Sequence, residues 1–159
     1  MDPTPSPSDH ADVRVLPPVL YLGSLFLGVA LHWIVPLGFA SGGHLRALVG
    51  IVLALAGFAL GGWAFVFHRR TQQDPDPRKP SPELIGGGPY RYTRNPMYVG
   101  MALIQAGVGI ALGNAWILLL LPPTMWINQR YVIEREEAYL ERRFGPPYAA
   151  YRAAVRRWL

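Results

Sequence analysis

The stretch ALVGIVLALAGFALGGWAFVF, residues 47–67, decides the fold class of this 159-residue chain. It contains no charged residue, and it is long enough to cross the hydrocarbon core of a bilayer, which needs about 20 helical residues. A second stretch, LPPVLYLGSLFLGVALHWIVPLGF over residues 16–39, also lacks Asp, Glu, Lys and Arg. With a hydrophobic fraction of 51%, this clustering fits a membrane protein better than a soluble globule.

Two shorter apolar stretches follow, over residues 97–112 and 115–127. Because each is shorter than the roughly 20 residues that cross a bilayer, we expect their cytosolic ends to be polar and to lie in the headgroup layer. We therefore predict an all-α integral membrane protein with a single domain over residues 15–159 and cytosolic interfacial helices near its C-terminal end. About four transmembrane helices are predicted, over residues 16–39, 45–68, 96–113 and 114–133.

The basic residues predict the orientation of these helices. The chain has a net charge of +5, and all but one of its 15 Lys and Arg residues lie before the first stretch, between the second and third, or at and beyond the end of the fourth. The exception is Arg46. By the positive-inside rule, both termini and the 68–95 loop are expected in the cytosol, with the chain in a bacterial inner membrane or its equivalent. Topology thus accounts for the charge, and nucleic acid is not an expected partner.

Other features limit the remaining possibilities. Residues 1–14 lack apolar periodicity, so we expect a disordered cytosolic tail there. The chain has no cysteine, which excludes disulfides, a thiolate nucleophile and cysteine-ligated metal, and no metal site is expected. Gly57 and Gly61 form a GxxxG pair, which serves packing within one chain as well as between chains, so the oligomeric state stays open.

Polar chemistry is concentrated in two blocks, residues 86–100 and 130–157, which the predicted topology places together at the cytosolic face. In the first block, Tyr90, Tyr92 and Tyr98 surround Arg91 and Asn95. A sulfonium cofactor needs aromatic faces for its adenine, a guanidinium for its carboxylate and a ring or carbonyl oxygen near its sulfur. The same residues would also suit a tyrosine-rich belt at the membrane interface.

The second block places acidic residues where the last helix leaves the membrane. Arg130, Glu134, Glu137 and Glu141 share one helical face, while Glu136 lies about 100° further round. Pairing along the helix explains Arg130 with Glu134. Two adjacent glutamates are harder to explain as packing, because burying either one without a partner is costly. We expect one of them to bind a cationic or hydroxyl-bearing ligand.

Two motifs carry a resemblance to a known family. GPYRYTRNPMYVG, residues 88–100, is followed by REEAYLERRFGPPYAAYRAAVRRW, residues 135–158. In order and spacing they resemble the isoprenylcysteine carboxyl methyltransferase and phospholipid methyltransferase superfamily, over roughly residues 86–157. The resemblance implies that both blocks enclose S-adenosylmethionine at the cytosolic face. It implies cofactor contacts by Gly88, Tyr90, Arg91, Asn95, Pro96, Tyr98, Glu136, Glu137, Tyr148 and Tyr151.

The chain departs from the family at Asn95, where many carboxyl methyltransferases have His. An amide is no general base near neutral pH, so Glu136 or Glu137 must supply a base if the reaction needs one. Glu137 is otherwise expected to recognise ribose or an amine. The residues expected to take part in catalysis are Asn95, Tyr98, Glu136 and Arg152.

The expected function is methyl transfer from S-adenosylmethionine to a lipophilic acceptor, which releases S-adenosylhomocysteine. Tyr98 is expected beside the methyl group, Asn95 orienting polar atoms, and Arg91 and Arg152 at the carboxylate of the cofactor or an anionic group of the acceptor. An isoprenylcysteine-like carboxylate, a lipid amine or a small thiol are all open as acceptors. The alternatives are an NADPH-dependent enzyme similar to the sterol reductases and a non-enzymatic four-helix membrane scaffold.

Overall fold

The computed structural model describes residues 11, 13, 15–39, 43–72, 74, 76 and 78–159. Within this part of the chain the regular elements are helical, and an isolated bridge between Gly38 and Asn114 is the only β pairing. The prediction of an all-helical chain is confirmed. In chain order the elements are α1 (Pro17–Ile34), α2 (Gly43–Arg70), η1 (Gly88–Arg91), α3 (Pro96–Leu112), α4 (Ala115–Leu119), α5 (Leu121–Asn128), η2 (Gln129–Ile133), α6 (Glu134–Phe144) and α7 (Pro146–Ala154).

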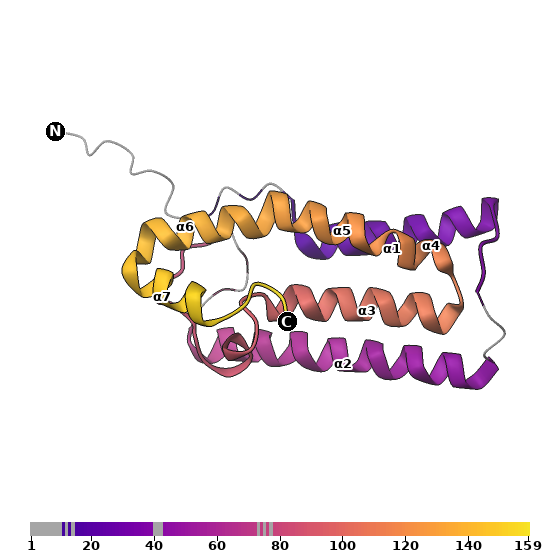
Figure 1. The fold of residues 1–159 in the computed structure, drawn as a ribbon, viewed down its shortest axis with the longest axis horizontal. Coiled ribbons are helices and arrows are strands. Elements are labelled where there is room, and N and C mark those ends of the chain that lie inside the picture. Colours follow the sequence, from indigo (N-terminus) through magenta and orange to yellow (C-terminus); the bar gives the residue numbers. More distant parts are fainter. Residues whose placement is uncertain are drawn as a thin grey trace.

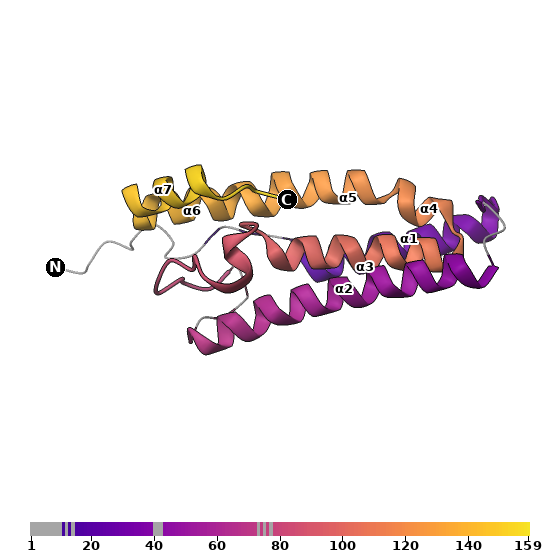
Figure 2. The same ribbon diagram turned by 60° about the horizontal axis from the view of Figure 1, so that its bottom comes forward.

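The long helices lie lengthwise beside one another. Helix α3 packs along α2, and α1 lies against α3, α4 and α5. Figures 1 and 2 show α6, α7 and the segment that leads into α3 together at one end of this bundle. The opposite end holds the connection between α3 and α4. The two sequence blocks that carry the motifs therefore meet at the same end of the molecule.

Two of these helices have the length and apolar character of a membrane span. They are α1 and α2, which correspond to the predicted spans over residues 16–39 and 45–68. Helix α3 is apolar but shorter. The predicted fourth span is divided into α4, α5 and η2, a π-helical turn. Four transmembrane helices therefore remain a prediction, while two are of spanning length in the described part of the chain.

A tight turn joins α3 to α4 and explains why α3 ends where it does. Gly113 has a φ of +65°, the left-handed conformation that glycine adopts most easily at the end of a helix. Asn114 then caps α4, since its side-chain oxygen accepts hydrogen bonds from the N–H groups of Trp116 at 3.0 Å and Ile117 at 3.3 Å. Gly113 and Asn114 together make the short turn between these two helices.

Glycines allow the backbones of α2 and α3 to lie in direct contact. A Cβ atom added at Gly50 would lie 2.3 Å from Ala111 N, and one at Gly57 would lie 2.6 Å from the carbonyl oxygen of Gly100. Such distances are far inside van der Waals contact, so a larger side chain would push the helices apart. Gly50 and Gly57 thus serve packing within one chain, whereas a Cβ atom at Gly61, the second glycine of the GxxxG pair, would meet nothing within 4 Å.

Two residues of the segment before α1 are packed against the helices, although the sequence predicts a disordered tail over residues 1–14. Ala11 and Val13, the residues of the 1–14 segment that the structure describes, are only 1% and 5% exposed. They pack in an apolar cluster with Tyr98, Ile133 and Tyr139. The other residues of the predicted tail lie outside the described part of the chain. Ala11 and Val13 are buried by apolar contacts with three separate helices. The local sequence has no periodicity that would predict such contacts.

Candidate active site

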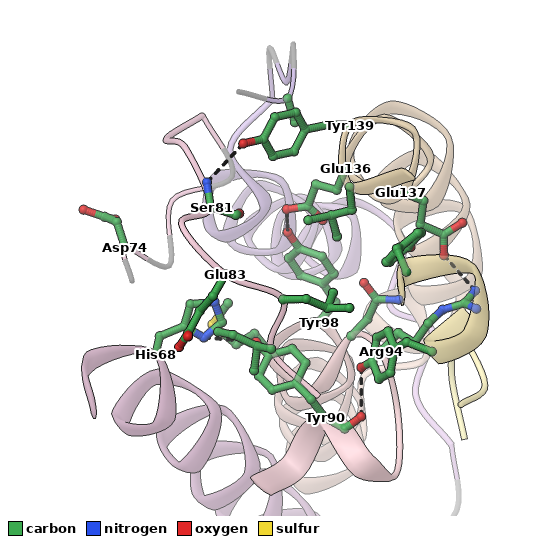
Figure 3. Close-up of a pocket in the computed structure, with 18 of the residues that line it drawn as sticks. His68, Asp74, Ser81, Glu83, Tyr90, Arg94, Tyr98, Glu136, Glu137 and Tyr139 are labelled. Atoms are coloured by element: carbon green, nitrogen blue, oxygen red, sulfur yellow. Dashed lines mark hydrogen bonds and ion pairs between the residues drawn. The ribbon is translucent and has the colours of Figure 1, made fainter. Parts of the chain in front are cut away.

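A polar pocket lies where the two motif blocks meet (Figure 3). Its walls come from the end of α2, the segment before η1, the start of α3, and helices α6 and α7. Most of the residues predicted to bind the cofactor line it. They are Tyr90, Asn95, Tyr98, Glu136, Glu137, Tyr148 and Tyr151.

The π-helical turn η2 determines how α6 faces this pocket. A π turn inserts one extra residue into a helix, so the residues that follow are rotated by about 100° relative to a continuous α-helix. The Arg130 Nη1 atom lies 2.6 Å from Glu134 Oε2 across the turn, which confirms the predicted pairing of these two residues. Beyond the turn, Glu136 and Glu137 bond to two different parts of the protein.

Glu137 is held by two arginines. Its Oε1 atom accepts a 2.8 Å hydrogen bond from Arg94 Nη2, and its two oxygens accept bonds of 3.0 and 2.6 Å from Nε and Nη2 of Arg157. Arg94 also donates from Nη1 to the carbonyl oxygen of Arg152 at 2.9 Å. The same contacts hold the pKa of Arg157 above its usual value. Glu137 therefore positions Arg94, which lines the pocket, and joins it to the C-terminal segment.

Glu136 lies in a different environment. The Tyr98 hydroxyl donates a 2.9 Å hydrogen bond to Glu136 Oε1 (Figure 3). Burial is the main cause that raises the pKa of Glu136, to about 8; the hydrogen bond from Tyr98 opposes this rise, and the charge of Glu137 adds to it. A carboxyl group with such a pKa can hold or release a proton near physiological pH. Of the two adjacent glutamates, Glu136 is the one suited to proton transfer.

Tyrosine side chains form much of the remaining wall. The Tyr151 hydroxyl donates to the carbonyl oxygen of Tyr90 at 2.8 Å, and the Tyr90 hydroxyl lies 3.2 Å from His68 Nδ1. The rings of Tyr148 and Tyr151 are 6.2 Å apart at their centroids. Burial raises the pKa of Tyr148 to about 12 and also raises the pKa values of Tyr90 and Tyr151. These hydroxyls therefore stay protonated at neutral pH, and the rings offer faces for a planar or cationic group.

Asn95 lines the pocket, but its side-chain amide is already hydrogen-bonded to another segment of the chain. Its Nδ2 atom donates to the carbonyl oxygen of Arg157 at 2.9 Å, and the hydroxyl of Thr93 donates to the same oxygen at 3.0 Å. The backbone N–H of Asn95 donates in turn to the Thr93 hydroxyl at 3.2 Å. Asn95 thereby ties the first motif to the C-terminal end of the second.

The other predicted site residues lie outside the pocket walls. Gly88 and Pro96 are backbone positions, one at a φ of +56° and the other the first residue of α3. Arg91 is exposed. Arg152 is exposed as well, and its Nη1 atom lies 2.8 Å from Glu141 Oε2.

Sequence reasoning missed several residues of the site. Arg94 lines the pocket, whereas the sequence predicts a role for Arg91 of the same motif. A local pattern does not show which of the two arginines packs inward. From the sequence, Arg157 is expected only as a basic residue near the membrane surface. His68 falls at the end of the predicted span over residues 45–68, yet it lines the pocket from the end of α2.

The segment between α2 and η1 covers one side of the pocket. Ser81 is held at both its backbone groups: its N–H donates to the Tyr139 hydroxyl at 3.1 Å, and its carbonyl oxygen accepts from Arg143 Nε at 2.7 Å. Leu84 and Ile85 of the same segment contribute to the pocket wall. Residues 81–85 are therefore anchored to α6 and form part of the pocket wall.

Comparison with known proteins agrees with this arrangement. A model of the phospholipid methyltransferase family matches residues 43–147. A protein from Schizosaccharomyces pombe named Protein-S-isoprenylcysteine O-methyltransferase is 39% identical over 72 residues, which make up 45% of this chain and 30% of that protein. An uncharacterized protein from Haemophilus influenzae is 43% identical over 65 residues, 40% of this chain and the whole of that protein.

The match with the S. pombe enzyme thus spans about 30% of the length of that relative. No solved structure matches the chain. The matched residues 43–147 include α2, α3 and most of the residues that line the pocket. Because this match covers well over half of the sequence, the chain belongs to the phospholipid methyltransferase family, a family of membrane methyltransferases.

Proposed function

We propose that this protein transfers a methyl group from S-adenosylmethionine to a nucleophile on a lipophilic acceptor at the cytosolic face of the membrane. The family and the name of the S. pombe relative support methyl transfer. The observation that carries the proposal is the pocket in which the Tyr98–Glu136 bond lies beside the Arg94–Glu137 ion pair. It combines a carboxyl group suited to proton transfer with a cation and several aromatic rings.

The residues of the pocket fit this cofactor. The Nε atom of Arg94 is buried and has no hydrogen-bond partner, so it is a donor left over for a ligand carboxylate. The rings of Tyr90, Tyr148 and Tyr151 could hold adenine, and the carboxylate of Glu137 could accept bonds from ribose hydroxyls or an ammonium group. S-adenosylmethionine supplies a methyl group that is already activated by the positive charge on its sulfur.

The chain itself has to align the acceptor and handle one proton. In the reaction a bond forms between the methyl carbon and the acceptor nucleophile, and the carbon–sulfur bond breaks with its electron pair passing to sulfur. A carboxylate acceptor arrives ionised and needs no base. An amine or thiol loses a proton, which the ionised carboxylate of Glu136 accepts while the Tyr98 hydroxyl holds that carboxylate in place.

The proposed topology indicates the side from which each substrate enters the pocket. With both termini and the 68–95 loop in the cytosol, the pocket lies at the cytosolic surface of the bilayer. A water-soluble cofactor enters from the cytosol, and a lipophilic acceptor enters from the membrane.

Calorimetric binding to the detergent-purified protein tests this proposal. The ligands are S-adenosylhomocysteine and NADPH, and the variants are Arg94→Ala and, as a control, Arg91→Ala, which removes an exposed arginine from the same motif. We expect saturable binding of S-adenosylhomocysteine that is weakened at least about tenfold by Arg94→Ala, because a buried charge-assisted bond is lost, and that is unchanged in Arg91→Ala.

Two results would contradict the proposal. Binding of NADPH without S-adenosylhomocysteine would favour the reductase, and binding of neither compound to folded protein would favour the scaffold.

A further inference from the structure

The surroundings of His68, at the end of α2, determine which of its ring nitrogens carries a proton. Its Nδ1 atom lies 3.2 Å from the carbonyl oxygen of Ala64, one turn back in the same helix, and 3.2 Å from the Tyr90 hydroxyl. A carbonyl oxygen only accepts hydrogen bonds, so the first contact is favourable only when Nδ1 carries the proton. In the neutral ring Nε2 then keeps its lone pair and is a hydrogen-bond acceptor.

The same contacts leave the Tyr90 hydroxyl able to donate. Because Nδ1 of His68 is protonated, the hydroxyl oxygen accepts from it, and the hydroxyl hydrogen can point elsewhere. Within the described part of the chain, Nε2 of His68 bonds to nothing and the Tyr90 hydroxyl bonds only to Nδ1. Both residues line the polar pocket. One wall of the pocket therefore offers a ligand an acceptor beside a donor.

Packing holds both of these groups in place. The rings of His68 and Tyr90 meet edge to face, with their centroids 5.4 Å apart. The carbonyl oxygen of Tyr90 accepts a 2.8 Å hydrogen bond from the Tyr151 hydroxyl. Gly88 lets η1 lie directly on Phe67, the neighbour of His68 in α2, since a Cβ atom there would be 2.5 Å from Phe67 Cδ2. A donor and an acceptor that are already fixed lose little freedom when a ligand binds, which favours selective binding.

An acceptor beside a donor matches one edge of adenine. The exocyclic amino group of this base donates hydrogen bonds, and the ring nitrogen next to it accepts them. Hypoxanthine has a carbonyl oxygen in place of the amino group, so it presents an acceptor where adenine presents a donor. The wall formed by His68 and Tyr90 is therefore complementary to adenine and not to hypoxanthine.

The opposite side of the pocket suits the other end of the cofactor. Figure 3 shows His68 and Arg94 on opposite sides of the pocket, with Tyr98 between them. The buried Nε atom of Arg94 has no partner among the described residues and can donate to a carboxylate. S-adenosylmethionine carries adenine at one end and a carboxylate at the other, so its two ends differ in chemistry as these two sides of the pocket do.

We propose that His68 and Tyr90 recognise the adenine of the cofactor. Nε2 of His68 accepts a hydrogen bond from the exocyclic amino group, and the Tyr90 hydroxyl donates to the adjacent ring nitrogen. The faces of the base are left to the rings of Tyr148 and Tyr151. The inference rests on the proposed function and names the residues that determine which nucleoside the pocket binds.

Calorimetry with two ligands tests the inference. The full-length protein, purified in detergent, is titrated at pH 8, where a histidine with the ordinary pKa of about 6.5 is neutral. The ligands are S-adenosylhomocysteine and S-inosylhomocysteine, and the second has hypoxanthine in place of adenine. His68→Phe and Tyr90→Phe remove the hydrogen-bonding atoms and keep a ring at each position. The controls are His44→Phe, at an exposed position of the same helix, and Tyr92→Phe, at a position that is 65% exposed.

We expect the native chain to bind S-adenosylhomocysteine at least about tenfold more tightly than S-inosylhomocysteine, because the carbonyl oxygen of hypoxanthine would face the lone pair of Nε2. The preference should disappear in His68→Phe and Tyr90→Phe and stay unchanged in both controls. Unchanged binding of S-inosylhomocysteine in the two pocket variants would show that the pocket is intact. His68→Gln, whose side-chain oxygen can accept a hydrogen bond in place of Nε2, should recover part of the preference.

Two results would overturn the inference. One is equal affinity of the native chain for the two ligands, a comparison that needs no variant to fold. The other is a preference for S-adenosylhomocysteine that persists in both phenylalanine variants.

The inference and the proposed function fail in different ways. Binding of S-adenosylhomocysteine to the native chain without discrimination against S-inosylhomocysteine overturns the adenine site alone and leaves the proposed function standing. Absence of S-adenosylhomocysteine binding to the folded native chain overturns the proposed function and the inference with it.

Discussion

Arg94 and Arg157 both bind the carboxylate of Glu137, at 2.8 Å and 2.6 Å. Arg94 precedes α3, Glu137 lies in α6, and Arg157 lies close to the C-terminus, so one buried carboxylate joins three parts of the chain. The 2.9 Å bond from Arg94 N–H to the carbonyl oxygen of Arg156 strengthens the same junction. The pocket exists because this junction brings the first motif against the second.

Replacing Arg157 with alanine should loosen this junction. Glu137 would keep Arg94 but lose its second cation, and we expect a loss of about 2 kcal/mol in the free energy of unfolding, because a largely buried carboxylate is left with one partner fewer. Thermal unfolding of the purified protein should show a melting temperature lower by several degrees. The matched control is Arg156→Ala, which removes an exposed neighbouring arginine and should melt like the native chain. Equal melting temperatures for the two variants would contradict this account of the junction.

The stability of the protein should depend on pH through Glu136. Burial raises the pKa of this carboxyl to about 8 from an ordinary value of 4.5, so between these pH values the folded chain holds a proton that the unfolded chain has lost. The stabilisation is complete below about pH 4.5 and is lost as the pH rises to about 8, and it amounts to a few kcal/mol at most. Melting temperatures measured from pH 5 to pH 8.5 should fall more steeply for the native chain than for Glu136→Gln. Parallel curves would show that Glu136 is ionised throughout.

The pH dependence of the reaction should reveal whether Glu136 acts as a base. With an amine or thiol acceptor, kcat should rise as the pH increases to about 8 and then level off, because only the ionised carboxylate accepts a proton. Glu136→Gln should remove the rise and lower kcat by roughly 10²-fold or more. Transfer of labelled methyl groups to extracted lipids, measured over this pH range, provides the test. A native-like profile in the glutamine variant would mean that the nucleophile arrives already ionised, as a carboxylate does.

The close packing of α2 against α3 should make Gly107 intolerant of any side chain. A Cβ atom at this position would lie 2.5 Å from the Ala54 nitrogen and 2.5 Å from the carbonyl oxygen of Gly50. Gly107→Ala should therefore destabilise the protein by roughly 3 kcal/mol, because the two helix backbones have to move apart. Gly62→Ala is the control, since nothing lies within 4 Å of the added atom, and it should be neutral or slightly stabilising. Similar melting temperatures for the two variants would argue against the helix contact.

The sequence by itself determined the helical fold and the approximate position of each long helix. Hydropathy is a local property, so the apolar stretches predicted α1, α2 and α3 without any knowledge of their neighbours. The turn at Gly113 and Asn114 is local in the same sense, because a left-handed glycine and a capping asparagine act on the adjacent backbone. The order and spacing of the two motifs also indicate the family.

Only the tertiary structure determined which individual side chains are buried and with which charged groups they pair. The choice of Arg94 over Arg91, and the different environments of Glu136 and Glu137, depend on contacts between residues far apart in the sequence. The π turn over Gln129–Ile133 adds to this, because it rotates α6 relative to the helix before it, and no periodic pattern in the sequence shows that rotation. Local sequence sets which residues form a helix, whereas burial and charge pairing, which determine the chemistry of each group, arise only when separate helices pack together.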